Sequence, residues 1–269
     1  MIVDGHVHIC EPPHDDSRLS RKNINGSRVQ WSDTRADAAV DRLVEAMDGN
    51  GIDRALIMGL EGIVSNEYLG EVVASDPRLT GFAWVEDPKR PEAVGELETA
   101  VLDHGLSGLK LHPGLQSFSP SQSEVVPLIR RAAELGVPVL IHCYPFPPGH
   151  YENNLPHHID SLKKAVPEAT VIVGHMGQVN YHDMLALVRH PGLVVETSWG
   201  LTLLAELNGL DYAARFLRRM GVEKAVYGSD WFGPNGEMER QLGLIERLDL
   251  TRVEKDMILG GNISRVMSH

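Results

Sequence analysis

The 269-residue sequence is short of cysteine, of aromatic side chains and of positive charge. Two cysteines, Cys10 and Cys143, are too few for a disulfide framework and fit free thiols in a reducing compartment. Lys and Arg total 25 against 37 Asp and Glu, which gives a formal net charge of −12. Nucleic-acid-binding proteins usually present a basic surface, so this balance argues against a DNA or RNA partner. An anionic substrate remains compatible, because a local cluster of bases can reverse the field inside one cleft.

Long apolar runs are missing as well. No stretch approaches the roughly 18–20 apolar residues that a transmembrane helix needs, so we expect no membrane span. A strand-like segment carrying a candidate catalytic motif already begins at residue 4. Removal of a signal peptide would destroy that motif, which argues against one. Together these features predict a cytoplasmic protein.

Apolar, β-branched segments alternate with amphipathic ones along the whole chain, as in βαβ units around a parallel sheet. Strands are expected at Ile2–Ile9, Arg54–Leu60, Leu79–Val85, Gly108–His112, Pro138–Cys143, Thr170–Gly174, Leu193–Thr197 and Ala225–Asp230. Helices are expected at Asp33–Asp48, Pro91–His104, Ser123–Leu135 and Tyr212–Met220, with a short closing helix at Met257–Met267. The prediction is therefore an α/β fold, a single eight-stranded parallel (β/α)8 TIM barrel spanning residues 1–269.

Two connections are longer than simple turns and would rise over the carboxyl-terminal face of such a barrel. They span residues 10–32 and 144–155. We interpret the pair as binding loops, although for any single residue a solvated surface position is the preferred interpretation. Their notable side chains are Arg18, Arg21, Lys22, Arg28 and Trp31 in the first, and Tyr144, Phe146, His150 and Tyr151 in the second.

Polar side chains stand at or near the ends of five expected strands. They are Asp4, His6, His8, Lys110, His112, His142, His175 and Asp230. Residues two apart on a strand face the same side, so Asp4, His6 and His8 should point together into the barrel. Taken alone, His142 or His175 is explained equally well as a buried, hydrogen-bonded structural histidine. One shared cation explains all these strand ends more economically than separate structural reasons.

These motifs resemble the amidohydrolase superfamily, and most closely its amidohydrolase-related (amidohydrolase 2) branch of metal-dependent hydrolases and decarboxylases. The resemblance rests on Asp4-x-His6-x-His8, Gly108-x-Lys110-x-His112-Pro113, His142, His175 and Gly228-Ser229-Asp230, and it extends to the ending Leu259–Val266. It covers essentially the whole chain. Its motifs are specific for the fold and much less specific for the reaction.

By that resemblance, the metal ligands would be His6, His8, His142 and Asp230, around one divalent ion, with Zn²⁺ expected. His175 would lie beside the ion as an acid/base or carbonyl-polarising group. Neutral imidazoles and a carboxylate also suit zinc on chemical grounds. The alternative is a two-metal site bridged by a carboxylated Lys110.

The substrate pocket is expected to include Lys110, His112, Trp231 and Tyr144, with Lys110 as the binder of a substrate carboxylate. The phase of the strand at Leu193–Thr197 leaves open whether Glu196, Thr197 or Ser198 also faces the pocket. Aromatic residues near the strand ends, Trp84, Trp199, Trp231 and Phe232, suit either an aromatic pocket wall or plain packing.

The expected reaction is hydrolysis of a C–O bond of a small lactone or ester, or of a C–N bond of an amide. A metal-activated water would attack, with Asp230 as its base. The alternative is non-oxidative decarboxylation of a small carboxylic acid such as an aromatic one, with His175 as the acid. A binding barrel without catalysis is a third hypothesis, which an Asp230→Asn variant would separate from an enzyme. The partner would be a small molecule, and a homodimer is compatible because related barrels often dimerise.

Overall fold

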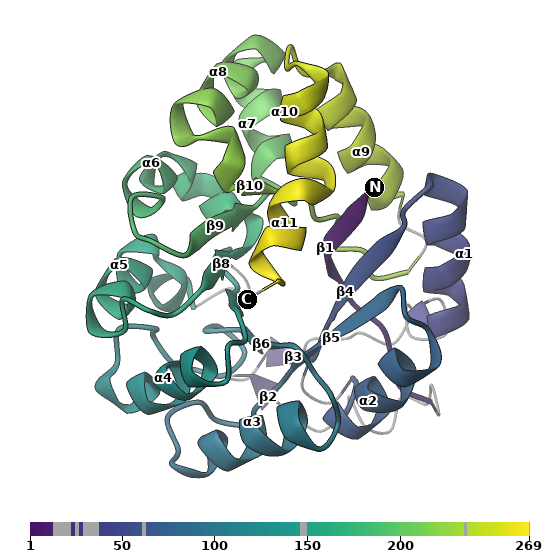
Figure 1. Cartoon of the computed structure of the whole chain (residues 1–269). Coiled ribbons are helices and arrows are strands. Elements are labelled where there is room, and N and C mark those ends of the chain that lie inside the picture. The colour runs from purple at the N-terminus through teal and green to yellow at the C-terminus, as the bar shows by residue number, and fades with distance from the viewer. Residues whose placement is uncertain are drawn as a thin grey trace.

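Eight parallel strands form one sheet in chain order, and helices surround it (Figure 1). The computed structural model describes residues 1–12, 23–24, 27–28, 38–60, 63–145, 150–233 and 236–268. The strands are β1 (Val3–Val7), β4 (Arg54–Met58), β5 (Leu79–Ala83), β6 (Gly108–Leu111), β7 (Val139–Ile141), β8 (Val171–Val173), β9 (Leu193–Glu196) and β10 (Ala225–Val226). The predicted parallel eight-stranded TIM barrel is confirmed, and each strand lies inside its predicted range.

The barrel closes where β1 meets the segment that follows β10. The amide of Gly5 donates to the carbonyl of Tyr227 at 2.9 Å, and the amide of Asp230 donates to the carbonyl of His6 at 2.8 Å. A third bond, from the amide of His8 to the carbonyl of Trp231 at 2.8 Å, continues the seam beyond both strands. Backbone hydrogen bonds therefore join the first strand to the segment after the last strand and close the barrel.

The helices lie outside the strands. Those described are α1 (Val40–Asn50), α2 (Asn66–Ser75), α3 (Glu92–Leu102), α4 (Val126–Glu134), α5 (Pro156–Ala165), α6 (Met184–Leu187), α7 (Gly200–Asn208), α8 (Leu210–Met220), α9 (Glu237–Arg247), α10 (Arg252–Asp256) and α11 (Asn262–Val266). Helices α1, α3, α4, α8 and α11 fall on predicted helices, whereas α2, α5, α6, α7, α9 and α10 lie outside the predicted ranges. A short antiparallel pair, β2 (Asn23–Ile24) and β3 (Ser27–Arg28), belongs to the long first loop.

The core has two layers. Side chains between the sheet and the outer helices form the larger layer. A smaller interior layer is formed by Leu56, Met58, Phe82, Leu140, Ile172, Val194 and Val226 together with Val3, Ile263 and Val266. Helix α11 supplies the last two and covers the amino-terminal end of the barrel (Figure 1). Helix α11 does not cover the opposite, carboxyl-terminal end of the barrel, which is therefore the end where a site is expected.

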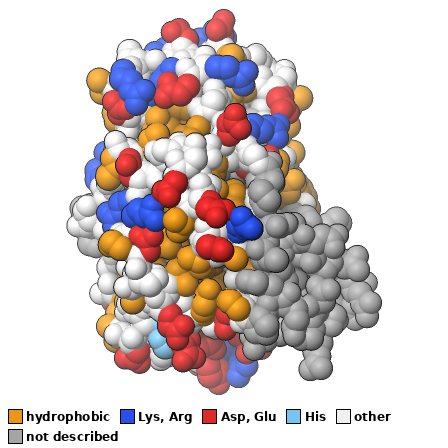
Figure 2. Space-filling view, turned by 90° about the vertical axis from the view of Figure 1, so that its right-hand side faces the viewer, with side chains coloured by type: hydrophobic (Ala, Val, Ile, Leu, Met, Phe, Trp, Pro, Cys, Tyr) orange, Lys and Arg blue, Asp and Glu red, His pale blue; other side chains and the backbone are white. Residues whose placement is uncertain are grey.

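No helix within the described ranges is both long and apolar enough for a bilayer crossing. Figure 2 shows acidic and basic side chains interspersed over one face of the molecule, with apolar ones between them.

Candidate metal centre

A cavity of about 250 Å³ opens at the carboxyl-terminal end of the barrel. It is lined by His8, Leu60, Lys110, His112, Leu115, His142, Tyr144, His175, Trp199, Asp230 and Phe232. All the predicted site residues except His6 and Trp231 are among these. His6 is fully buried and contacts several of the lining residues.

A register shift in β1 aims its histidines. Val3 packs in the interior layer, so its neighbour Asp4 faces the other way. The pairing with β4 then shifts between Asp4 and Val7, which places His6 and His8 toward the site. The expectation that Asp4 shares their face is wrong. Its Oδ1 instead accepts from the amides of His6 at 3.1 Å and Ser229 at 2.9 Å, and burial raises the pKa of this carboxyl to about 7.

Two overlapping groups of side chains can hold a metal ion, and both contain His6. In the first, Oδ1 of Asp230 lies 3.4 Å from Nε2 of His6 and 3.2 Å from Nε2 of His8. The second combines His6 with His175 and Glu196. Imidazole nitrogens and carboxylate oxygens are donors that divalent ions such as Zn²⁺ accept. The arrangement is consistent with one divalent ion.

His142, the fourth predicted ligand, lies beside these groups rather than within them. Its Nδ1 is 2.9 Å from Nε2 of His175. Its Nε2 is buried and has no hydrogen-bond partner among the described residues, yet the side chain lines the cavity. A buried polar atom without a partner requires an explanation, and an ion at the cavity wall would provide one.

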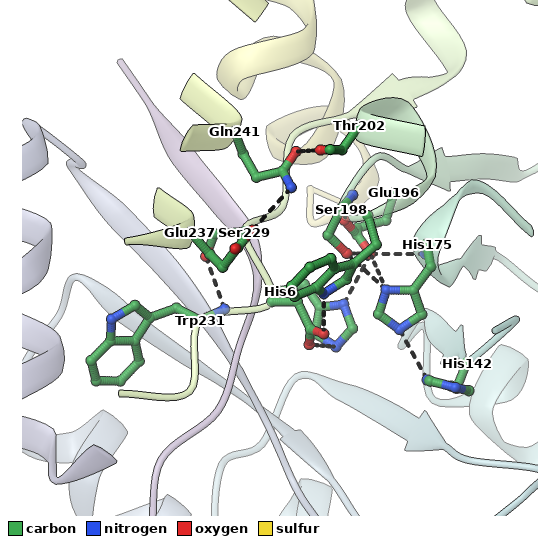
Figure 3. Close-up of polar contacts among 12 residues, drawn as sticks. His6, His142, His175, Glu196, Ser198, Thr202, Ser229, Trp231, Glu237 and Gln241 are labelled. Atoms are coloured by element: carbon green, nitrogen blue, oxygen red, sulfur yellow. Dashed lines mark hydrogen bonds and ion pairs between the residues drawn. The ribbon is translucent and has the colours of Figure 1, made fainter. Parts of the chain in front are cut away.

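Glu196, at the end of β9, is a site residue whose orientation the sequence left open. Its Oε2 is 2.9 Å from Nδ1 of His6, and it accepts from the amide of His175 at 3.1 Å and the hydroxyl of Ser198 at 2.9 Å (Figure 3). Gly228 makes room for it, because a Cβ there would overlap Oε1 of the carboxylate. The sequence position of Glu196 could have indicated this orientation. Val194, two residues earlier on the same strand, packs in the barrel interior, and residues two apart face the same side.

Three rim residues have a left-handed backbone, which bulky residues adopt at a cost. They are His175 (φ 56°), Trp199 (φ 55°) and Asp230 (φ 56°). The turn at His175 directs its Nδ1 to the hydroxyl of Ser198, at 2.8 Å. The indole N–H of Trp199 donates to Oδ2 of Asp230 at 2.8 Å. Backbone conformation, rather than strand alternation, therefore aims these side chains.

Trp231 is not in the pocket, contrary to expectation. Its indole is 2 % exposed and points away from the histidines (Figure 3). The physical reason is that neighbouring side chains along an extended segment face opposite sides. Asp230 faces the site, whereas Trp231 pairs with Val7 of β1 and both pack in the larger core layer. Trp199 and Phe232 line the cavity instead.

Lys110, His112 and Tyr144 line the cavity. Nζ of Lys110 is 2.9 Å from Nε2 of His6. His112 stacks on His142 with ring centroids 3.7 Å apart, and Tyr144 meets the edge of the His142 ring. Lys110 is the only lysine or arginine among the described residues that line the cavity.

Burial dominates the electrostatics of the site. It lowers the pKa of His175 to about 4 and holds those of His6, His112 and His142 well below their usual range. Neutral imidazoles are the form that binds metal. Burial also lowers the pKa of Lys110 to about 8.

The pKa values of the two site carboxyls, Glu196 and Asp230, shift in opposite directions. Burial raises the pKa of Glu196. At Asp230 burial acts in the same sense, but the neighbouring histidines and a hydrogen bond from His8 outweigh it and hold the pKa well below its usual range. Asp230 is also the most accessible of the donor groups, with 23 % of its side chain exposed.

Only parts of the two long loops lie within the described residues. Arg18, Arg21, Lys22 and Trp31 lie outside the described residues, and of Arg28 only the backbone in β3 is described. Phe146 lies outside them too. His150 is buried and Tyr151 begins the short helix η4 (Tyr151–Asn154). The predicted role of the loops in binding stays a prediction.

Comparison with known proteins places this geometry in context. The family described as amidohydrolase matches residues 3–267. None of the curated proteins matches the chain.

Several solved structures share the fold along the full length. An uncharacterised TIM-barrel protein from Bordetella bronchiseptica has a TM-score of 0.77 at 18 % identity, covering 99 % of this chain and 98 % of that one. A dihydroxybenzoic acid decarboxylase from Polaromonas, with bound manganese and the inhibitor 2-nitroresorcinol, has a TM-score of 0.70 at 18 % identity, covering 99 % and 96 %. A probable 2-pyrone-4,6-dicarboxylic acid hydrolase from Acinetobacter baumannii, with citric acid bound, has a TM-score of 0.72 at 18 % identity, covering 100 % and 99 %. At this identity the likeness establishes the fold alone.

Proposed function

The chain belongs to the amidohydrolase family, and we propose that it is a metal-dependent hydrolase of a small lactone, ester or amide. The observation that carries the proposal is that the two carboxylate oxygens of Asp230 have different neighbours. Its Oδ1 faces His6 and His8, whereas its Oδ2 is held by the indole of Trp199, at the wall of an open cavity. A carboxylate in that position can serve as a ligand and as a base.

His6, His8, His142 and Asp230 would hold one divalent ion, with Zn²⁺ expected. Nε2 of His142 supports this fit, because this buried nitrogen has no hydrogen-bond partner among the described residues and could bind the ion. The ion would supply Lewis-acid activation of water and of the carbonyl oxygen. A second ion bridged by carboxylated Lys110 is the alternative, because the lowered pKa of Lys110 eases formation of the neutral amine that carboxylation requires.

The protein's own groups would move the protons. Asp230 would accept one from the attacking water and return it to the leaving group. His175, which lines the cavity, would act on the carbonyl oxygen as the imidazolium, whose Nε2–H would leave His142 for the substrate as that oxygen gains charge. Lys110 would bind an anionic group of the substrate, and Tyr144, His112, Trp199 and Phe232 would enclose its body.

Decarboxylation is the second candidate, and a specific observation favours it. One cation, Lys110, faces a cavity whose other walls include Tyr144, Trp199 and Phe232. That combination suits a planar ring carrying a carboxylate. A decarboxylase and a probable lactone hydrolase also share the fold with this chain at similar TM-scores.

A substrate panel separates the two reactions. The purified protein, loaded with Zn²⁺ or Mn²⁺, would be incubated with lactones, esters, amides and hydroxybenzoates, and both acid release and carbon dioxide would be measured. Hydrolysis predicts new acid without carbon dioxide, whereas carbon dioxide from a hydroxybenzoate supports the second candidate. Asp230→Asn should abolish turnover. If His6→Ala leaves metal content and activity intact, the proposed site is wrong.

We also propose a cytoplasmic location and a small-molecule substrate as the partner, with a homodimer as the assembly to test. The location is supported by Cys10 and Cys143, which are both buried and form no disulfide with each other. Metal analysis of the same preparation counts one ion or two per chain.

A further inference from the structure

We propose that Glu196 is a positioning residue that sets the tautomers of His6, His175 and His142 and so prepares two of them to bind the ion. The inference rests on the ion site of the proposed function, but not on the reaction carried out there. Its basis is the direction in which hydrogen bonds can run through the buried cluster of Figure 3.

The carboxylate of Glu196 is fixed as an acceptor by backbone groups that can only donate. The amide of Ser198 donates to Oε1 and the amide of His175 donates to Oε2, the latter at 3.1 Å. The remaining contacts, from His6 and Ser198, also reach Oε2. An added proton on this carboxyl would meet donors on every side, so the arrangement suits the ionised form.

The first branch runs directly to His6. Nδ1 of His6 is 2.9 Å from Oε2 of Glu196, and an acceptor-only oxygen requires the proton to sit on Nδ1. A neutral imidazole carries one proton, so Nε2 is left as a bare lone pair. That atom faces the ion site, with Nζ of Lys110 at 2.9 Å and Oδ1 of Asp230 at 3.4 Å.

The second branch runs through a hydroxyl. Ser198 donates its proton to Oε2 of Glu196 at 2.9 Å, so its oxygen accepts from Nδ1 of His175 at 2.8 Å. Nε2 of His175 is then bare and accepts from Nδ1 of His142 at 2.9 Å. Nε2 of His142 is left bare in turn.

This order explains the orphaned atom described above. A buried N–H without an acceptor would be a lost hydrogen bond, but a lone pair facing the cavity is a vacant ligand position. The same order leaves Nε2 of His6 and Oδ1 of Asp230 as two acceptors 3.4 Å apart, which a cation stabilises. In this structure the Lys110 ammonium lies beside His6. A divalent ion would bind the lone pair of His142 and would also stabilise the two acceptors at His6 and Asp230.

A direct bond between Glu196 and the ion is the competing interpretation, because His6, His175 and Glu196 form one of the two possible metal groups. That bond would require the oxygen already bonded to Nδ1–H of His6. It would also turn His6 around, so that its Nε2 no longer served the cluster with His8 and Asp230. Glu196 therefore orients ligands and does not serve as one.

The first test is made on the unsubstituted protein and uses variants only to assign signals. Metal-free protein carrying ¹⁵N-labelled histidine rings would be studied by NMR at pH 7, with single His→Asn variants assigning the signals of His6, His142 and His175. All three should be neutral and protonated on Nδ1. Any of the three protonated on Nε2 instead would overturn the proposal, whether or not the protein proves to be a hydrolase.

The second test separates the two branches by metal titration. Co²⁺ binding would be followed by its visible absorption in Glu196→Gln and Ser198→Ala, with Glu237→Gln and Ser229→Ala as controls that change buried groups outside the chain of bonds. Glu196→Gln should weaken binding about 10–100-fold relative to Glu237→Gln. Ser198→Ala should release the tautomers of His175 and His142 and leave that of His6 unchanged.

Equal Co²⁺ affinity in Glu196→Gln and Glu237→Gln would refute the assignment of Glu196. An altered His6 signal in Ser198→Ala would refute the separation into two branches. If Glu196→Gln does not fold, the Ser198→Ala pair and the spectrum of the unsubstituted protein still decide the matter.

Discussion

Mild acid should destabilise the metal-free protein, because its buried histidines are held neutral. Burial lowers the pKa of His175 from 6.5 to about 4. The unfolded chain takes up this proton near pH 6.5, whereas the folded protein does not until about pH 4. The stability that His175 contributes is therefore present above pH 6.5 and is lost as the pH falls through that window.

The size of the effect follows from the shifts. His175 alone accounts for a loss of about 2 kcal/mol between pH 7 and pH 5, and about 3 kcal/mol by pH 4. The pKa values of His6, His112 and His142 are lowered well below the same reference, chiefly by burial. Each of these three should therefore add to the loss of stability as the pH falls.

Two buried carboxyls work in the opposite sense. Burial raises the pKa of Asp4 from 3.8 to about 7, so its contribution to stability grows as the pH falls from 7 toward 4. That gain is about 2 kcal/mol by pH 5 and offsets one histidine. Glu196, whose pKa burial also raises, acts in the same sense. His175 and Asp4 then nearly cancel. The three other histidines outnumber Glu196, so we expect a net loss on the order of 2 kcal/mol at pH 5.

Urea unfolding of the chelator-treated protein at pH 7 and pH 5 measures this difference. His175→Gln should reduce it, and His157→Gln should not, because His157 is exposed in the folded protein. A loss on the order of 2 kcal/mol is a measurable share of the roughly 5–15 kcal/mol that stabilises a typical protein. A difference below about 1 kcal/mol would refute the reasoning, since it would mean that the histidines are not buried as neutral rings.

Three further predictions concern the surroundings of the site. Gly228→Ala should cost about 1–3 kcal/mol of stability and displace Glu196, as judged by urea unfolding and Co²⁺ affinity, whereas Gly243→Ala on the exposed face of α9 should be neutral or stabilising. Trp199→Phe removes the donor to Oδ2 of Asp230 and should lower kcat about 10-fold with metal content unchanged; unchanged turnover would contradict a role for that bond. Chelation should lower the melting temperature and a divalent ion should restore it, which an ion-independent melting curve would disprove.

The strands and the first ligands could be read from the sequence because their signals are local. Each apolar segment ends in a polar side chain, and a barrel brings such ends to one rim. His6 and His8 follow from their spacing, and His142 and His175 from the runs before them. These residues do lie together around the cavity.

The two errors have different causes. A register shift in β1 separates Asp4 from His6, and Gly5 inside it was a weak signal, because a glycine within a strand often marks such an irregularity. Trp231 directly follows Asp230, and neighbouring side chains on an extended segment face opposite sides. The orientation of Glu196 was open for a related reason, since only its pairing partners determine which face of β9 it occupies.

The seam between β1 and the segment after β10 has a consequence for how the protein is made. The proposed ion site would take His6 and His8 from one side of that seam and Asp230 from the other, and backbone bonds join the two sides. A ribosome must deliver more than 220 further residues after His8 before the two halves can meet. A nascent chain would hold only part of the proposed ligand set, so we expect metal loading to follow synthesis, when the supply of ions around the finished protein would decide which one is captured.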